Sequence, residues 1–272
     1  RRGRPSSVRI RHQETVRNKD LLETALRTAR EKRSVKKAVR FLIHSNYLQR
    51  TPENVVSFLR KHHDDLDEGL IGEYICGLGG NDAEKKFFAR LRQCFMQGIG
   101  FTGMPFEKAL RHMLTSGGFR LPGEAQMIER IVVAFAETYW NDNRASGTFS
   151  NPDVVMVLAF SAIMLNTDLH NPNIKPERKM TKEGFIRNCE GIKDGRDFPR
   201  DFLERIFDRI DSNPISLRED DEARAREAQT SSGGFFDSTA RRRRHAFDRE
   251  RREILRATST RLVAAVKAPG GG

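Results

Sequence analysis

Two short segments bring together residue types that could act on another molecule. Residues 119–126 read FRLPGEAQ, so an acid, Glu124, follows a Pro-Gly break just before an apolar helical stretch. Residues 160–171 read FSAIMLNTDLHN, an apolar stretch that passes abruptly into small polar groups. An exposed carboxylate beside an apolar groove suits a protein that binds another protein and presents negative charge to it. These two segments are the candidate functional site.

Glu124 has a structural interpretation and a functional one. Because Pro122-Gly123 turns the backbone, Glu124 is predicted in the first turn of the following helix, where the helix dipole stabilises an acid by about 0.3–1 kcal/mol. If the neighbouring residues gave no further information, this stabilising role alone would explain a Glu at this position. The functional role is favoured by the groove helix downstream and by the residues around the same break: Phe119, Arg120, Leu121 and Gln126.

The most apolar stretch begins at Asn151-Pro152 and predicts a helix that runs to about Leu165. Most of this helix is expected to be core. The polar residues that follow Met164 and Leu165 favour a partner-binding end, because adaptable Met and Leu surfaces bordered by hydrogen-bonding groups suit interfaces. Asn166 and Asn171 could instead be simple C-terminal caps. A lone His170 is more often a packed histidine than a catalyst.

Helical periodicity recurs through the middle of the chain, with no convincing run of alternating strand pattern. Thr51 and Thr181 are predicted N-caps, with proline following the first at 52, and Asn151-Pro152-Asp153 is predicted to start the most apolar helix. Apolar residues at helical spacing predict further helices around residues 66–75, 87–95, 106–114, 128–139 and 202–210. Many short helices with tight links predict an all-α domain over residues 34–218.

The flanks differ from this middle region. Residues 1–33 form a basic N-terminal flank, helical or disordered, with a weak apolar stripe at Leu22, Ala25, Leu26 and Ala29. Residues 219–240 are acidic and then Ser/Gly-rich, which is typical of a linker. Residues 241–272 predict a basic amphipathic helix with a flexible end.

The net charge of +12 is concentrated in the flanks. Residues 1–50 carry 15 Lys/Arg against 4 Asp/Glu, whereas residues 51–218 carry 22 against 24. This distribution argues against a nucleic-acid-binding protein. Three widely spaced cysteines, at 76, 94 and 189, indicate reduced thiols and neither a zinc site nor a disulfide framework. The basic N-terminus predicts no signal peptide, and the apolar run 154–165 is too short to span a bilayer.

The two segments closely resemble the motifs of the Sec-seven domain, the catalytic module of guanine-nucleotide exchange factors for ARF-family small GTPases. FRLPGEAQ matches the first motif letter for letter, and AFSAIMLNTDLHNPN at 159–173 is similar to the second. The resemblance continues in LIGEY at 70–74, FEKALR at 106–111 and KMTKEGFIRN at 179–188. It covers about residues 34–218.

This resemblance implies an all-α fold of about ten short helices in a right-handed superhelix, with no cofactor and no metal. Glu124 would be the glutamic finger, entering the GTPase near the β-phosphate and Mg²⁺, where a carboxylate repels phosphate and competes for the cation and the P-loop lysine. The residues implied to contact the GTPase are Phe119, Arg120, Leu121, Pro122, Gly123, Ala125, Gln126, Phe160, Ile163, Met164, Leu165, Asn166, Thr167, Asp168, His170, Asn171 and Met180.

The chain departs from the family pattern in two places. Residues 115–118, TSGG, make the segment before Phe119 longer and looser than is usual. The stretch 171–180 is similar to that of the group with calmodulin-binding IQ motifs, although one loop does not assign a subfamily.

The resemblance implies an ARF-family GTPase as partner and a cytoplasmic protein recruited peripherally to membranes. The basic flanks could bind an anionic membrane surface or be solvated linkers. The rival to an exchange factor is an adaptor that binds the GTPase without exchanging its nucleotide, against which the intact Glu124 and Asn166 argue. A hydrolase is not supported, since the chain has no G-x-S-x-G, H-E-x-x-H or Walker A sequence.

Overall fold

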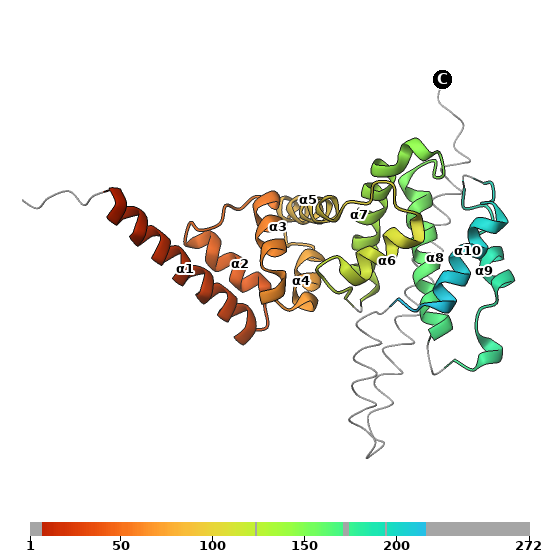
Figure 1. Ribbon diagram of the computed structural model, residues 1–272, viewed down its shortest axis with the longest axis horizontal. Coiled ribbons are helices and arrows are strands. Elements are labelled where there is room, and N and C mark those ends of the chain that lie inside the picture. Colours follow the sequence, from red (N-terminus) through yellow and green to blue (C-terminus); the bar gives the residue numbers. More distant parts are fainter. Residues whose placement is uncertain (1–6, 123, 171–173, 194, 216–272) are drawn as a thin grey trace, which may run out of the picture. The chain divides into compact units, whose positions relative to one another are not determined.

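The all-α prediction is confirmed by the computed structural model, which describes residues 7–122, 124–170, 174–193 and 195–215. Within these ranges the chain forms ten α-helices, three short 3₁₀ helices and no β-strand (Figure 1). The predicted linker and C-terminal helix at 219–272 lie outside the described residues. The α-helices are α1 (Ser7–Glu31), α2 (Val35–His44), α3 (Pro52–Lys61), α4 (Glu68–Ile75), α5 (Asp82–Ile99), α6 (Phe106–Ser116), α7 (Ala125–Asn143), α8 (Pro152–His170), α9 (Lys182–Asn188) and α10 (Arg200–Ser212).

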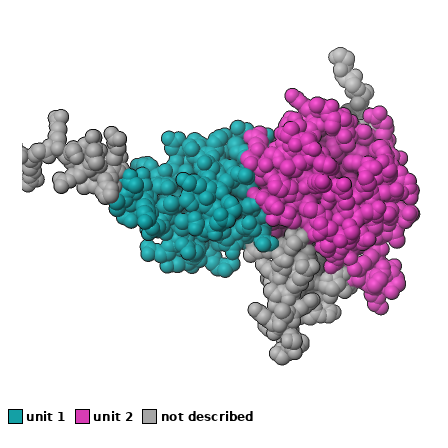
Figure 2. Space-filling view, viewed as in Figure 1, with its two compact units in different colours: residues 1–95, 118–120 teal, residues 96–117, 121–272 magenta. Residues whose placement is uncertain are grey.

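The chain divides into two compact units (Figure 2). The first unit comprises Arg1–Phe95 with Gly118–Arg120, and the second comprises Met96–Gly117 with the chain from Leu121 onward. The FRLPGEAQ segment therefore contributes its first two residues to one unit and the remainder to the other.

In the first unit, α1 packs against α2. Ala25, Leu26 and Ala29 are buried, so the apolar stripe predicted from the sequence serves the interior of the unit. Ser34 caps α2 by accepting a hydrogen bond from the Lys37 N–H. The second half of the expected N-terminal flank is thus a packed helix.

The segment Gly118–Arg120 lies on α4. The Arg120 N–H donates to the Glu68 carbonyl at 2.9 Å, and the Arg120 guanidinium lies 3.4 Å from the Glu68 carboxylate. Phe119 is almost fully buried and meets Phe95 edge to face, with ring centroids 5.6 Å apart. This close approach requires Gly72 on α4, because a Cβ there would lie 2.0 Å from the Arg120 carbonyl oxygen.

In the second unit, α7 and α8 pack together (Figure 1). An aromatic cluster fills the space between the start of α6 and the end of α7, with Phe135 stacked on Tyr139 at 5.7 Å and Phe101 edge-on to Phe135 at 5.1 Å. α6 extends through Ser116, so two of the four residues predicted as a loose loop, Thr115 and Ser116, are helical. The i→i−4 bonding of α6 outweighed the loop composition of TSGG.

α8 is longer than predicted, because it continues through the polar residues to His170. Its 19 residues are long and apolar enough to cross a membrane by length and composition, but 56% of the apolar window is buried inside the protein. Burial on this scale is typical of the central helix of a folded domain.

All three cysteines lie in described residues and none forms a disulfide. Cys189 is buried, and burial raises the pKa of its thiol to about 12. A thiol that stays protonated is a poor nucleophile and a poor metal ligand.

The contact between Gly72 and Arg120 gives a test of how the FRLPGEAQ segment is held. Gly72→Ala should lower the free energy of unfolding by about 1–3 kcal/mol, because the new methyl group must displace the Arg120 backbone. Urea unfolding measures this change. The matched control is Gly80→Ala, whose Cβ would meet only the Glu84 carboxylate, at an ordinary 3.6 Å. Equal stability of the two variants would contradict the close approach.

Candidate functional site

Glu124 is the N-cap residue of α7, one position earlier than the first-turn placement predicted from the sequence. Its backbone is extended (φ −89°, ψ 128°), and its carbonyl accepts hydrogen bonds from the Met127 and Ile128 N–H groups. The side chain is exposed and makes no capping hydrogen bond. Glu is a weak N-cap residue, since the preferred caps are Ser, Thr, Asp and Asn. The carboxylate is therefore held at a helix start, where the helix dipole favours it, but it makes no hydrogen bond to the helix N–H groups.

The residues around Glu124 divide into anchors and exposed groups. Phe119, Leu121 and Pro122 are buried and fix the segment to the fold, whereas Arg120 and Gln126 are exposed. Gly123 and the side chain of Ala125 lie outside the described residues. Within the second unit, the buried Leu121 and Pro122 lie shortly before Glu124 and give the exposed carboxylate a defined place on that unit.

The packing of α7 on α8 relates Glu124 to the second motif. Both helices have 19 residues, and the short connection 144–151 joins the end of α7 to the start of α8. Two packed helices of equal length with so short a connection run antiparallel. The N-cap of α7 and the C-terminal end of α8 therefore lie at the same end of the hairpin.

One face of α8 is left partly exposed near this end. Ser161, Met164, Thr167 and Asp168 are half-buried and recur at spacings of three and four residues, so they form one continuous line, the α8 stripe. Ser161 was not among the predicted contact residues, and four that were predicted face inward and are almost fully buried, namely Phe160, Ile163, Leu165 and Asn166. The predicted groove residues on this helix that stay partly exposed are Met164, Thr167, Asp168 and His170.

The polar side chains at the end of α8 hold other segments of the second unit in place. Asn166 is 1% exposed, donates to the Ile215 carbonyl at 3.0 Å and accepts from the Ile215 N–H at 2.7 Å. His170 Nε2 lies 2.7 Å from the Ile210 carbonyl of α10, so this ring nitrogen must carry the proton. Asn166 is therefore not the simple C-terminal cap that the sequence left open, whereas His170 is a packed histidine, the interpretation that the sequence favoured.

The loop after α8 is tied to the same helix end. The Asp168 carboxylate accepts a hydrogen bond from the Met180 N–H, and the Lys179 ammonium donates to the Leu169 carbonyl at 2.6 Å. A lysine on the last carbonyls of a helix also complements the helix dipole. Sequence reasoning missed Lys179, because it lies ten residues beyond Leu169 and no local pattern links it to the end of α8. Met180 is half-buried beside Asp168, and Asn171 lies outside the described residues.

The exposed Glu124 at the start of α7 and the half-buried α8 stripe at the end of α8 are the groups that the two motifs bring to one end of the hairpin. Among the described residues there is no group of three His, Cys, Asp or Glu side chains near enough to hold a metal ion. Comparison with known proteins shows the family to which the chain belongs. The Sec7 domain family matches residues 18–215. The match begins earlier than residue 34 and includes the second half of α1.

Curated relatives share about two-fifths of their residues with this chain. The chain is 42% identical over 186 residues to an ankyrin repeat, PH and SEC7 domain containing protein of Dictyostelium discoideum, covering 68% of this chain and 18% of that protein. It is 40% identical over 185 residues to brefeldin A-inhibited guanine nucleotide-exchange protein 3 of Arabidopsis thaliana, covering 68% of this chain and 10% of that protein. The chain thus spans less than a fifth of the length of these relatives.

Solved structures agree in fold. A Sec7 domain bound to ARF1-GDP and brefeldin A has a TM-score of 0.62 and 33% identity, covering 77% of this chain and 99% of that chain. The Sec7p catalytic domain has a TM-score of 0.59 and 38% identity, covering 71% and 95%. The chain belongs to the Sec7 domain family.

The pairing of Asn166 with Ile215 predicts a large stability effect. Asn166→Ala should lower the free energy of unfolding by about 2 kcal/mol or more, because it leaves the buried Ile215 N–H and carbonyl without partners, at about 1–3 kcal/mol each. Thr167→Ala is the neighbouring control, since its hydroxyl donates only to the Ile163 carbonyl of its own helix. Urea denaturation of both variants measures the difference. A loss no greater for Asn166→Ala than for Thr167→Ala would show that the pairing contributes little.

Proposed function

We propose that this chain is the exchange domain of a guanine-nucleotide exchange factor for ARF-family small GTPases. The observation that supports this most directly is the exposed Glu124 carboxylate, which makes no capping hydrogen bond, at the same end of the α7–α8 hairpin as the α8 stripe. Relatives of the same family are named as guanine nucleotide-exchange proteins, and a solved Sec7 domain is bound to ARF1-GDP.

The proposed role of Glu124 is electrostatic. Its carboxylate enters the nucleotide site of the GTPase, repels the β-phosphate and competes for Mg²⁺ and the P-loop lysine. Two unit charges 4 Å apart at an effective dielectric of about 20 interact by about 4 kcal/mol. A penalty of this size weakens nucleotide binding by about a thousandfold. No covalent bond changes, so the protein catalyses exchange without catalysing a chemical reaction.

The α8 stripe supplies the compensating interaction. Met164 and its neighbours contact the apolar switch regions of the GTPase and hold them in the arrangement that has lost its nucleotide contacts. A partner is shifted toward one conformation only by as much as it is bound more tightly in that conformation. In this proposal the protein binds both the GDP-bound and the nucleotide-free GTPase, and the nucleotide-free form more tightly.

Buried and half-buried polar residues of the same motif act through the fold. Asn166 and His170 fix α8 to Ile215 and Ile210, and Asp168 fixes Met180 beside the stripe. They keep the stripe in register, which is essential if the GTPase is to meet Glu124 and Met164 at the same time.

The decisive measurement is release of a fluorescent GDP from a panel of ARF proteins. The native chain should accelerate release, and Glu124→Lys should abolish most of that acceleration while leaving complex formation with the GTPase intact. Glu190→Lys, the same charge reversal at an exposed residue after α9, is the matched control and should remain active. A native chain that binds ARF but accelerates nothing would instead favour the adaptor.

We also propose that the basic N-terminal segment assists peripheral recruitment from the cytoplasm to an anionic membrane surface. Residues 1–50 carry a net +11, and each Lys or Arg near such a surface contributes up to about 1 kcal/mol. Because Ala25, Leu26 and Ala29 are buried in the first unit, the contribution of α1 is expected from charge and not from these apolar side chains.

Liposome co-sedimentation tests this role without removing a packed helix. Replacing five arginines by Gln should weaken binding to vesicles with anionic lipid at least tenfold and leave neutral vesicles unaffected: Arg1, Arg2, Arg4, Arg9 and Arg11. The control makes the same change in charge near the other end of the chain, at Arg241, Arg242, Arg243, Arg244 and Arg249. If both variants bind as the native chain does, the N-terminal segment has no membrane role.

A further inference from the structure

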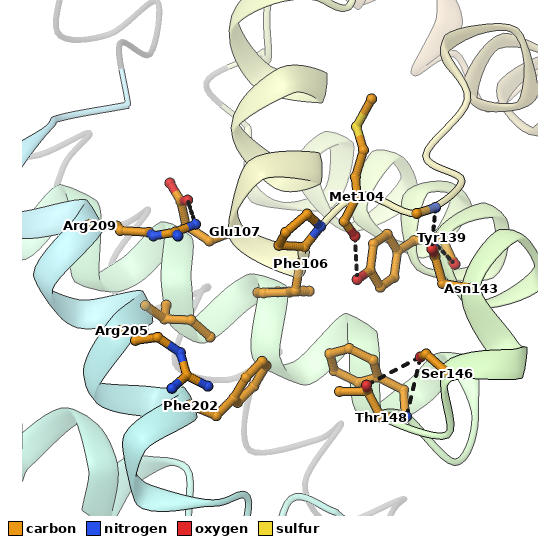
Figure 3. A pocket seen from close by; sticks show the side chains of 14 residues that line it. Met104, Phe106, Glu107, Tyr139, Asn143, Ser146, Thr148, Phe202, Arg205 and Arg209 are labelled. Atoms are coloured by element: carbon orange, nitrogen blue, oxygen red, sulfur yellow. Dashed lines mark hydrogen bonds and ion pairs between the residues drawn. The ribbon is translucent and has the colours of Figure 1, made fainter.

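The second unit contains a hollow of about 420 Å³ away from the candidate exchange site (Figure 3). It lies among the start of α6, the end of α7, the connection to α8 and one face of α10. We call it the distal pocket and define it by Phe106, Tyr139, Phe149, Phe202, Arg205 and Arg209. Tyr139 lies 15 residues along α7 from Glu124, about 22 Å at the helical rise. The distal pocket is therefore at the opposite end of the α7–α8 hairpin from Glu124.

Aromatic rings form the apolar wall of the distal pocket. Phe149 lies 5.5 Å from Phe106, 5.7 Å from Tyr139 and 6.2 Å from Phe202, measured between ring centroids. The Tyr139 hydroxyl already donates to the Met104 carbonyl at 3.0 Å, and burial raises its pKa to about 12, so it stays neutral. Rings packed against one another keep a fixed shape, and the wall is suited to an apolar group.

Positive charge gathers on one side of the distal pocket. The buried Glu107 carboxylate lies 2.8 Å from Arg111 and 3.5 Å from Arg209. Arg111 is held firmly, because it also donates to the carbonyls of Arg209, Asn213 and Pro214. Because Arg111 already neutralises the charge of Glu107, the charge of Arg209 leaves a net positive charge on this side of the pocket.

Arg205 adds a second cation one turn earlier on α10. It pairs with Asp201 on its own helix, and both side chains are largely exposed, so this pair contributes little and is readily exchanged for another anion. Figure 3 shows Phe202, Arg205 and Arg209 facing the pocket from α10, across from Tyr139 and Thr148. The charged residues that line the pocket are two arginines and one glutamate.

We propose that the distal pocket binds a small amphipathic anion, an apolar body carrying one phosphate or carboxylate head. The body would lie against the aromatic wall, and the head would accept hydrogen bonds from Arg209 and Arg205. The volume is in the range of ligand sites, which combine apolar walls with a few polar groups. An inorganic anion alone would meet only half-exposed arginines and bind weakly, and a neutral apolar molecule would leave the charge unused.

The chain carries its own reporter for this site. Trp140 is its single tryptophan, and the indole N–H donates to the carbonyl of Phe149 in the pocket wall at 3.2 Å. Octyl phosphate should bind saturably with one site per chain by calorimetry and shift the emission of Trp140 over the same concentration range. Octanol and inorganic phosphate, which each carry half of the ligand chemistry, should bind at least tenfold more weakly.

Two variants separate the charge from the cavity. Arg205→Gln with Arg209→Gln should weaken octyl phosphate binding about tenfold or more and leave octanol unaffected, whereas Arg200→Gln on the same helix, outside the pocket, should change nothing. Thr148→Phe should block both ligands by filling the hollow. The proposal would be overturned if octyl phosphate still bound after the arginine changes and after Thr148→Phe, or if its binding did not change Trp140 emission. It would also be overturned if octyl phosphate bound no more tightly than octanol or inorganic phosphate alone. None of these readouts depends on nucleotide exchange.

Discussion

The antiparallel packing of α7 on α8 decides where the functional groups of the second unit lie. Because the two helices have equal length and a short connection, the start of α7 and the end of α8 must lie together. Glu124 and the α8 stripe then occupy one end, and the aromatic pocket that includes Tyr139 and Phe149 occupies the other. A hairpin with one long apolar core is thus able to present two chemically different surfaces.

This arrangement requires α8 to be buried on most of its surface and yet to expose a narrow line of residues. Four of its last ten residues lie in the core, so the helix cannot rotate to expose Phe160 or Leu165 without a large loss of buried apolar area. The two-way pairing of the Asn166 amide with Ile215 adds a directional constraint that apolar packing does not supply. Buried polar groups inside the motif therefore help to determine which residues of α8 stay at the surface.

The parts of this structure that sequence reasoning predicted depend on local chemistry. Thr51 and Thr181 cap the helices that follow them, as predicted, and α8 begins at the predicted Asn151-Pro152. An N-cap needs only a side-chain oxygen and the free N–H three residues later, so the local sequence is enough to predict it. The end of α8 was predicted too early because polar residues usually mark a helix terminus. Their hydrogen-bond partners, at Ile210 and Ile215, are more than 35 residues distant in sequence. Only the tertiary structure supplies those partners.

The placement of Glu124 shows the same division between local and distant information. Its position after Pro-Gly predicted a helix start correctly, but not that it would be the N-cap, where its long side chain makes no hydrogen bond to the helix. A Ser or Asp there would cap α7 better, by about 0.5–2 kcal/mol relative to a residue that does not cap. The fold itself does not explain a Glu at this N-cap, between the buried Leu121 and Pro122 and the rest of α7, and this agrees with the role proposed for Glu124 toward a GTPase. Proteins depart from the locally most stable residue mainly at functional sites, so the weak N-cap at Glu124 is an argument for a function at that position.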